Sequence, residues 1–134
     1  MSASRNGLDP GFRAKLDLFE KRLKHRGIEV IMTCGYRSTE EQNKLYAKGR
    51  TAPGGIVTNA RGGYSWHNYG LAADYAFVID GKVTWNGPWA EFGIIAKECG
   101  LEWGGSWTKF RDRPHVQWTK GKTLAQMRAA NRKA

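Results

Sequence analysis

Apolar side chains recur every three or four residues near the start of the chain, a spacing that gives a helix one apolar face. These residues are Phe12, Leu16, Phe19 and Leu23. Asp9 and Pro10 precede them and supply an N-cap and a proline at the first helical position. The pattern predicts an amphipathic helix that ends near Gly27, with His25 in a basic last turn that complements the helix dipole.

Shorter stretches that alternate, or that are rich in β-branched and aromatic residues, predict strands. The longest stretch runs from Ala72 to Ile79, and Asp80-Gly81 after it is typical of a two-residue hairpin turn. The predicted strands span residues 28–33, 72–79, 82–85, 101–103 and 115–118.

A capping box of Ser38 and Glu41 predicts a second helix that runs to about Lys48. The next residues, 49–66, contain Pro53 and five glycines, and we interpret them as a long loop. Loops of this length in compact domains are usually functional or mobile. We therefore expect this loop to border a functional cleft and to move more than the sheet.

Pro88 predicts the start of a third helix, and Gly100 predicts its end. Thr123 is placed to cap a last helix, whose Leu124 and Met127 can dock on the rest of the molecule. Helices packed on a small, mainly antiparallel sheet make an α+β fold. The length of 134 residues suits one domain, spanning residues 1–134.

No apolar run approaches the roughly 20 residues that a membrane helix needs. The N-terminus carries no apolar stretch of the signal-peptide type, so we expect no ordinary secretory route. Cys34 and Cys99 are too few for a disulfide scaffold, and we interpret both as buried, reduced thiols.

The net charge of +10 favours a polyanionic partner, such as nucleic acid, anionic lipid or an acidic cell wall. The sequence has neither a zinc-finger spacing nor an aromatic RNA-binding signature, so we expect no specific nucleic-acid partner. The six tryptophans indicate aromatic packing, with some of them free to line a groove.

Residues 119–134 form a basic C-terminal segment without any acidic residue. Its basic residues are Lys120, Lys122, Arg128, Arg132 and Lys133. One interpretation is a solvated terminal helix. The other is an electrostatic anchor that holds the protein to an anionic wall or membrane surface.

His67 and Asp74 lie seven positions apart. One helix would separate them by about 10 Å along its axis, and one continuous strand by more than about 20 Å. If both bind one ion, the chain must bend between them, and Gly70 permits a bend there. The alternative is a salt bridge or a turn hydrogen bond of Asp74.

Strand parity describes the surroundings of Asp74. The same face of the strand carries Ala72, Ala76 and Val78. The other face carries Tyr75, Phe77 and Ile79. The bulky face can enter the core, while the small residues beside Asp74 leave room for an ion and a substrate. A carboxylate in such an apolar strand is costly without a partner.

A second group of polar residues is Asp112-Arg113-Pro114-His115. Proline disfavours a helix at the residue before it, so a turn followed by a strand would bring Asp112 beside His115. Two histidines and one carboxylate leave zinc an open fourth position, the arrangement of a catalytic site. The remaining carboxylate can then act as a general base.

Three motifs follow one another along the chain. The pattern S-x-H-x-x-G-x-A-x-D is complete over residues 65–74, and D-x-x-H, with proline before the histidine, spans residues 112–115. Upstream, G-Y-R-S at residues 35–38 is followed by Gln42 and Tyr46. Together these motifs resemble the D-Ala-D-Ala metallopeptidase superfamily (peptidase family M15), which includes VanY-type carboxypeptidases and the vancomycin-resistance dipeptidases. The likeness is greatest to the L-alanyl-D-glutamate peptidases of phage endolysins, and it covers about residues 8–120.

The resemblance implies a hedgehog/D-Ala-D-Ala peptidase-like zinc fold with one catalytic Zn²⁺. The implied zinc ligands are His67, Asp74 and His115. Asp112 takes the place of the general base, and Arg37 would bind substrate and polarise the scissile carbonyl. Ser65 would orient substrate or ligands near the metal. Several relatives have glutamate at the base position, and the shorter Asp112 suits the endolysin branch.

The resemblance further implies a monomeric phage endolysin that hydrolyses the L-alanyl-D-glutamate bond of peptidoglycan stem peptides and lyses the host. Such a protein is made in the host cytoplasm without a signal peptide and reaches the periplasmic wall after holin-type release. One alternative is a D-Ala-D-Ala carboxypeptidase that trims peptidoglycan. Another is a non-catalytic, cationic binder of cell wall or nucleic acid that retains a structural metal.

Overall fold

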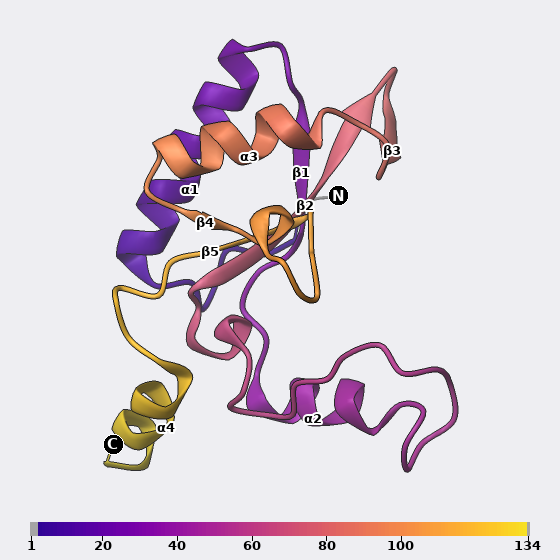
Figure 1. The fold of residues 1–134 in the computed structure, drawn as a ribbon, viewed down its shortest axis with the longest axis vertical. Coiled ribbons are helices and arrows are strands. Elements are labelled where there is room, and N and C mark those ends of the chain that lie inside the picture. The colour runs from indigo at the N-terminus through magenta and orange to yellow at the C-terminus, as the bar shows by residue number, and fades with distance from the viewer. Residues whose placement is uncertain (1–2, 134) are drawn as a thin grey trace.

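An antiparallel sheet of five strands forms the centre of the structure, a computed structural model that describes residues 3–133. The strands are β1 (Val30–Cys34), β2 (Ala72–Ile79), β3 (Lys82–Thr84), β4 (Glu102–Trp103) and β5 (His115–Gln117). Their order is β1-β2-β5-β4, and β3 pairs with the last residues of β2 (Figure 1). The predicted α+β fold with a mainly antiparallel sheet is confirmed.

Four α-helices and two short 3-10 helices surround the sheet within these residues. They are α1 (Pro10–His25), α2 (Thr39–Ala47), α3 (Trp89–Glu98), α4 (Leu124–Lys133), η1 (Trp66–Tyr69) and η2 (Gly104–Ser106). Helices α1 and α3 cross one another beside the sheet, whereas α2 and α4 lie at the opposite end of the molecule (Figure 1). The four predicted α-helices are confirmed, and η1 and η2 are additions to the predicted elements.

The core lies between α1, α3 and β2. The predicted apolar face of α1 is completely buried and consists of Phe12, Leu16, Phe19 and Leu23. Phe19 packs edge-on against Tyr75 of β2 and Phe92 of α3, with ring centroids 5.7 and 5.0 Å apart. Complete burial of a large apolar side chain contributes roughly 1.5–3 kcal/mol. This aromatic cluster therefore holds β2 firmly against both helices.

The two faces of β2 differ as parity predicted, with one exception. Tyr75 and Phe77 are buried in the core. Ile79 is 44% exposed, so its predicted place in the core is wrong. It lies at the end of β2, where the predicted hairpin turn leads into β3 and leaves the helices behind. The turn residues Asp80 and Gly81 both have positive φ, as a tight hairpin requires.

The first strand begins two residues later than predicted, at Val30. Ile28 completes the end of α1 instead, because its N–H donates to the carbonyl of Leu23 at 2.9 Å. Gly27, with φ of 78°, donates to Lys24 at 2.9 Å. These two bonds form a Schellman motif, which uses Ile28 as an apolar cap rather than as a strand residue.

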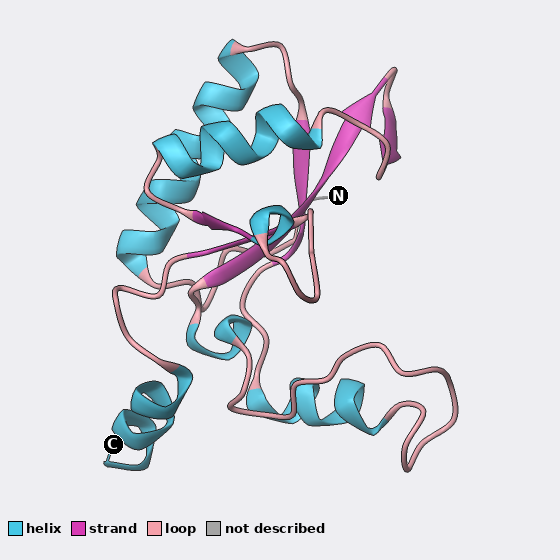
Figure 2. Cartoon of the chain, in the orientation of Figure 1, coloured by secondary structure: helices cyan, strands magenta, loops and turns pink. Residues whose placement is uncertain are grey.

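A long loop joins α2 to η1 and projects from the molecule (Figure 2). The guanidinium of Arg50 donates to the carbonyl oxygens of Tyr46 at 2.7 Å and Thr58 at 3.1 Å. The completely buried Gln42 of α2 donates its amide to the carbonyl of Ala60 at 2.6 Å. These bonds tie the base of the loop to α2, whereas residues 51–57 at its tip are all exposed.

Within residues 3–133, no helix combines the length and the apolar character required to cross a membrane.

The tip of the loop is expected to exchange its amide hydrogens much faster than β2. Residues 51–57 are exposed, whereas β2 is hydrogen-bonded to strands on both sides. Hydrogen–deuterium exchange of the substrate-free protein, followed by mass spectrometry, measures both segments in one experiment. Equal protection of the tip and of β2 would contradict the predicted mobility.

Candidate metal centre

Three polar residues lie side by side across the sheet. In the strand register, Cys34 of β1 faces Asp74 of β2, and Asp74 faces His115 of β5. Residues directly opposite one another in neighbouring strands point to the same face of the sheet. The register therefore places a thiol, a carboxylate and an imidazole in one row, with Asp74 in the middle.

His67 reaches this row from η1. The hydroxyl of Ser65 caps η1 by accepting from the N–H of His67 at 3.3 Å, and Gly70 ends it with a left-handed φ of 68°. A side chain at Gly70 would collide with the backbone of Gly7. The predicted bend between His67 and Asp74 is therefore a single 3-10 turn closed by a glycine.

The bend brings the predicted metal ligands together. Nε2 of His67 lies 3.4 Å from Oδ2 of Asp74, and Nδ1 of His115 lies 3.1 Å from Oδ1 of the same carboxylate. The two imidazole rings are 5.2 Å apart between centroids. Asp74, Asp112 and His115 also have ligand atoms within 4.8 Å of one another. These residues come from η1, β2, β5 and the turn before β5.

A backbone carbonyl orients the buried ring of His67. Its Nδ1 lies 2.8 Å from the carbonyl oxygen of Gly35, which can only accept a hydrogen bond. In the neutral form of His67 the proton therefore stays on Nδ1, and the lone pair of Nε2 faces Asp74. A hydrogen bond of this kind on the outer nitrogen is typical of metal-binding histidines.

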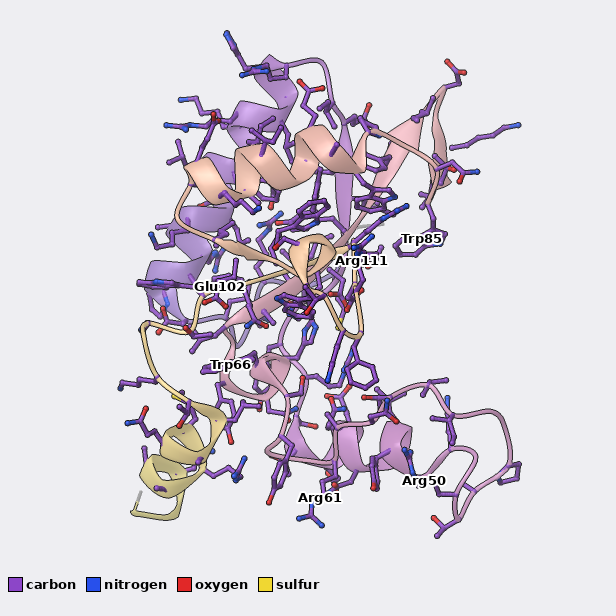
Figure 3. All side chains as sticks on the ribbon, viewed as in Figure 1. Arg50, Arg61, Trp66, Trp85, Glu102 and Arg111 are labelled. Atoms are coloured by element: carbon purple, nitrogen blue, oxygen red, sulfur yellow. The ribbon has the colours of Figure 1, made fainter. Side chains whose placement is uncertain are left out.

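A chain of two side chains orients the ring of His115. The carboxylate of Glu102, a residue of β4 labelled in Figure 3, accepts from Nε2 of Gln117 at 2.8 Å. The amide oxygen of Gln117 must then face His115, whose Nε2 lies 2.7 Å away. His115 donates from Nε2 and leaves Nδ1 free toward Asp74. Gln117 faces Ala72 in the register, where the small side chain leaves room for the amide.

The charges of the centre favour a cation. Burial alone would raise the pKa of Asp74, but hydrogen bonds and charges of His115 and His67 hold it well below its usual range. Burial alone would lower the pKa of His67, yet hydrogen bonds and charges of Asp74 and Cys34 raise it to about 10. The negative potential that favours a proton at His67 also favours a metal ion, and the donor set of two imidazoles and a carboxylate fits zinc.

Asp112 lies beside this donor set but is less enclosed. Its Oδ2 is 3.9 Å from Nδ1 of His115, and its side chain is 48% exposed. Burial raises the pKa of Asp112, and the negative charge of Asp74 raises it further, against the opposing charges of the two histidines. A carboxylate with a raised pKa that remains open to solvent is suited to accepting and returning a proton.

Arg37 lies at the other end of the row. Its Nη2 donates to Sγ of Cys34 at 3.1 Å, and its Nη1 donates to the side-chain oxygen of Gln42 at 2.8 Å. Because Gln42 is completely buried and also bonded to the loop, it holds the guanidinium in place. Arg37 and Asp112 thus lie on the β1 side and the β5 side of the centre.

An open cleft of about 830 Å³ surrounds these groups. The predicted site residues that line it are Arg37, Ser65, His67, Asp74, Asp112 and His115. Residues 57–60 of the long loop form part of its wall, so the predicted position of this loop beside a cleft is confirmed. The ring of Trp107 packs 5.3 Å from that of His115 and covers one side of it.

The sequence and the fold both match known peptidases. A model of the D-alanyl-D-alanine carboxypeptidase family matches residues 58–118. The chain is 45% identical to the peptidoglycan L-alanyl-D-glutamate endopeptidase CwlK of Bacillus subtilis, over 82% of this chain and 72% of that protein. The chain belongs to the D-Ala-D-Ala metallopeptidase family. The resemblance inferred from the three motifs is confirmed, and the chain is an enzyme of the peptidase class.

A phage protein is a more distant relative. The L-alanyl-D-glutamate peptidase of Listeria phage A118 is 31% identical over 69% of this chain. The match covers 31% of that phage protein, so the chain corresponds to about a third of its length.

Two solved structures of family members show the same fold. The L-Ala D-Glu endopeptidase ChiX of Serratia marcescens superposes with a TM-score of 0.64 at 27% identity, over 86% of this chain and 83% of that one. The D,D-pentapeptidase VanY of a VanB-type resistance cassette, solved in complex with Zn(II), gives a TM-score of 0.59 at 21% identity. That match covers 94% of this chain and 86% of VanY.

Sequence reasoning missed three polar residues of this family member. Cys34 was interpreted as a buried core thiol, but it is only partly buried and lies beside Arg37 and His67, whereas Cys99 is buried as predicted. Cys34 comes directly before the G-Y-R-S motif, and this position is the signal that could have identified it as a residue of the site. Gln117 and Glu102 carry no such signal, because only the pairing of β4 with β5 brings them together.

Replacing Gln117 by leucine is expected to weaken zinc binding by roughly 10- to 100-fold, because His115 loses the acceptor that orients it. Gln117→Glu combined with Glu102→Gln keeps an acceptor oxygen toward His115 and a hydrogen bond between the two side chains, and it should bind zinc close to the wild-type affinity. Competition with a chromophoric chelator measures the affinity, and circular dichroism checks folding. Wild-type affinity in a folded Gln117→Leu protein would show that this bond does not orient the ring.

Proposed function

We propose that this chain is a zinc-dependent endopeptidase that hydrolyses the L-alanyl-D-glutamate bond of peptidoglycan stem peptides. The observation that carries the proposal is its 45% identity to an endopeptidase of that specificity, over 82% of the chain. All three motifs that define the resemblance contribute residues to one cleft, so the residues required for peptide hydrolysis lie together in this chain.

In this proposal His67, Asp74 and His115 hold one zinc ion. The relative VanY, which was solved with Zn(II), supports zinc as the metal of the fold. A bound zinc ion supplies Lewis acidity, which makes water more acidic and stabilises negative charge on a carbonyl oxygen. His67 would contribute Nε2 and His115 would contribute Nδ1, because the other nitrogen of each ring is engaged in a hydrogen bond.

The remaining residues have roles that follow from their places. Asp112 accepts a proton from the attacking water and returns it to the departing amine. Arg37 polarises the scissile carbonyl and stabilises the negative charge that develops on its oxygen. Ser65 acts through η1, since its hydroxyl caps the turn that carries His67, and it borders the cleft where substrate would lie.

The biological role in this proposal is that of a phage endolysin, which lyses the host from within. The relative in Listeria phage A118 supports it. The protein would accumulate in the host cytoplasm and reach the wall after holin-type release. The test is expression in the cytoplasm of a Gram-negative host, which should lyse only after chloroform opens the inner membrane. Lysis without permeabilisation would contradict this route.

A second candidate activity is D-Ala-D-Ala carboxypeptidase action, because the matching family model carries that description. Mass spectrometry of purified peptidoglycan after digestion distinguishes the two. New N-terminal D-glutamate and free C-terminal L-alanine are expected from the proposed endopeptidase. Loss of terminal D-alanine alone would identify the carboxypeptidase, and an unchanged digest would leave a non-catalytic binder.

Removal of zinc is expected to abolish lysis, and added zinc is expected to restore it. Alanine at His67, Asp74 or His115 should reduce zinc occupancy and remove activity, since each change deletes one donor. Turbidity of wall suspensions gives activity, and inductively coupled plasma mass spectrometry gives occupancy. Full activity of the chelated protein would exclude the zinc mechanism.

Asp112 is expected to separate chemistry from metal binding. Asp112→Asn should fold and hold zinc but lose roughly 10²–10⁴ in rate, because it removes the general base and not a ligand. Kinetics and metal analysis on the same sample decide the question. Loss of zinc together with activity would make Asp112 a ligand.

We further propose that the basic C-terminal segment, residues 119–134, holds the enzyme to an anionic surface. Two of its basic side chains already have partners. Lys120 forms a 2.7 Å ion pair with Asp9, and Arg128 stacks on the ring of Tyr64 at 3.9 Å. Lys122 is exposed, and the side chains of Arg132 and Lys133 lie outside the described residues.

Glutamine at Lys122, Arg132 and Lys133 is therefore expected to slow wall lysis at low salt and to have less effect at high salt. Screening shortens electrostatic reach from about 10 Å at 0.1 M salt to about 3 Å at 1 M. Cleavage of a short soluble stem peptide should not change. The matched control replaces Lys21, Lys24 and Lys82, which are exposed elsewhere. Equal slowing of wall lysis by both triple variants would show that only the net charge of the protein matters, and it would contradict a specific role of the C-terminal segment.

A further inference from the structure

A shallow groove of about 410 Å³ continues from the metal cleft past Asp112. It is lined by Trp85, Trp89, Arg111, Asp112, Arg113 and Pro114. Arg111 and Asp112 line the cleft as well, so the two hollows meet at the proposed general base. Figure 3 shows the side chain of Trp85 close to that of Arg111.

One wall of the groove is an exposed aromatic ring on a fixed support. The carbonyl of Trp85 accepts from Nε1 of Trp89 at 2.8 Å. Trp89 in turn packs against Phe77 and Phe92, with ring centroids 4.3 and 5.1 Å apart. The backbone at Trp85 is thus tied to the core, while its own side chain remains 54% exposed. An indole held open in this way offers a flat surface to a ligand.

The other wall carries two cationic side chains. Arg111 and Arg113 flank Asp112, and both are exposed. Arg111 donates from Nε to the carbonyl of Trp107 at 3.4 Å, a bond that does not use its two terminal nitrogens. Among residues 3–133, neither guanidinium lies within ion-pair distance of a carboxylate. Both are therefore available to a carboxylate of a ligand, which a guanidinium binds in a bidentate manner.

The geometry of the centre indicates which half of the substrate lies in the groove. Arg37 lies on the β1 side and acts on the scissile carbonyl, whereas Asp112 lies on the β5 side and returns a proton to the departing amine. The half of the substrate that carries this amine must therefore lie on the Asp112 side. For an L-alanyl-D-glutamate bond, that half begins with D-glutamate. Because D-glutamate in stem peptides is linked onward through its side-chain carboxyl, its α-carboxylate stays free beside the scissile bond.

We propose that the groove of Trp85, Arg111 and Arg113 binds the acidic half of the stem peptide that leaves with the amine. The free α-carboxylate of D-glutamate pairs with Arg111 or Arg113, and the following residue lies against Trp85. This inference rests on the proposed function and adds a specificity to it. The enzyme distinguishes stem peptides with D-glutamate from those whose α-carboxylate is amidated.

The test uses the zinc-loaded enzyme and two soluble stem peptides that differ only at this carboxylate. One peptide carries the free carboxylate, and the other carries its amide. The wild type should have the lower KM for the acidic peptide. Arg111→Gln and Arg113→Gln are examined singly and together, and the double variant should lose a preference of roughly tenfold, the size of one charge-assisted hydrogen bond. Its KM should rise much less for the amidated peptide than for the acidic one, because the amidated peptide has no carboxylate to lose. Trp85→Ala should raise KM for both peptides, because an aromatic surface does not read the charge.

Arg13→Gln, alone and together with Lys21→Gln, is the matched control for the single and the double variant, because both side chains are exposed on α1 and neither lines the groove. It should retain the wild-type preference. Equal KM values of the wild type for the two peptides would overturn the proposal, as would a double arginine variant that keeps the preference.

A failure of the proposed function is recognised separately. If the zinc-loaded wild type cleaves neither peptide at the L-alanyl-D-glutamate bond, isothermal titration calorimetry still compares how tightly it binds the acidic and the amidated form. Tighter binding of the acidic form that depends on Arg111 and Arg113 would support the groove. Equal binding would overturn it.

Discussion

The rest of the structure depends on a half-buried carboxylate at the centre of the sheet. Asp74 lies in β2 among apolar residues, where an unpaired charge would be severely destabilising. The register of β2 with β5 and the turn of η1 bring an imidazole to each of its oxygens. A slip of one residue in β2 would turn Asp74 into the aromatic core and Tyr75 out of it. The chemistry of the site and the packing of the core therefore require the same register.

Each face of β2 makes contacts that require this register. On one face, the aromatic cluster around Phe19 and Phe92 fixes the strand against α1 and α3. On the other face, the row of Cys34, Asp74 and His115 meets the cleft. Both faces share one backbone, so the packing that fixes β2 against the helices also fixes the backbone that carries Asp74, as a preorganised site requires.

Local signals in the sequence predicted the α-helices and the strands, and the family resemblance predicted the residues that meet at the centre. Helical spacing predicted α1, and the capping box of Ser38 predicted the start of α2. The three motifs of the resemblance contain Arg37, His67, Asp74, Asp112 and His115, which the structure brings to one cleft. Local signals failed where a contact depends on strand pairing: neither the alignment of Gln117 with Glu102 nor the place of Cys34 beside Asp74 can be read without the register. The predicted start of β1 was wrong because Ile28 fits a strand residue and the apolar residue of a Schellman motif equally well.

The different nitrogens that the two histidines turn toward Asp74 follow from how each backbone approaches it. His115 is the direct neighbour of Asp74 in the sheet, so the near nitrogen, Nδ1, faces the carboxylate and Nε2 extends to Gln117, two residues along the strand. His67 comes from a separate turn and needs its full length, so Nε2 reaches Asp74 while Nδ1 stays close to the carbonyl of Gly35. An acceptor placed behind the other nitrogen of each ring would turn the proton of that ring toward Asp74. The hydrogen bonds behind the rings therefore decide which nitrogen of each histidine faces Asp74.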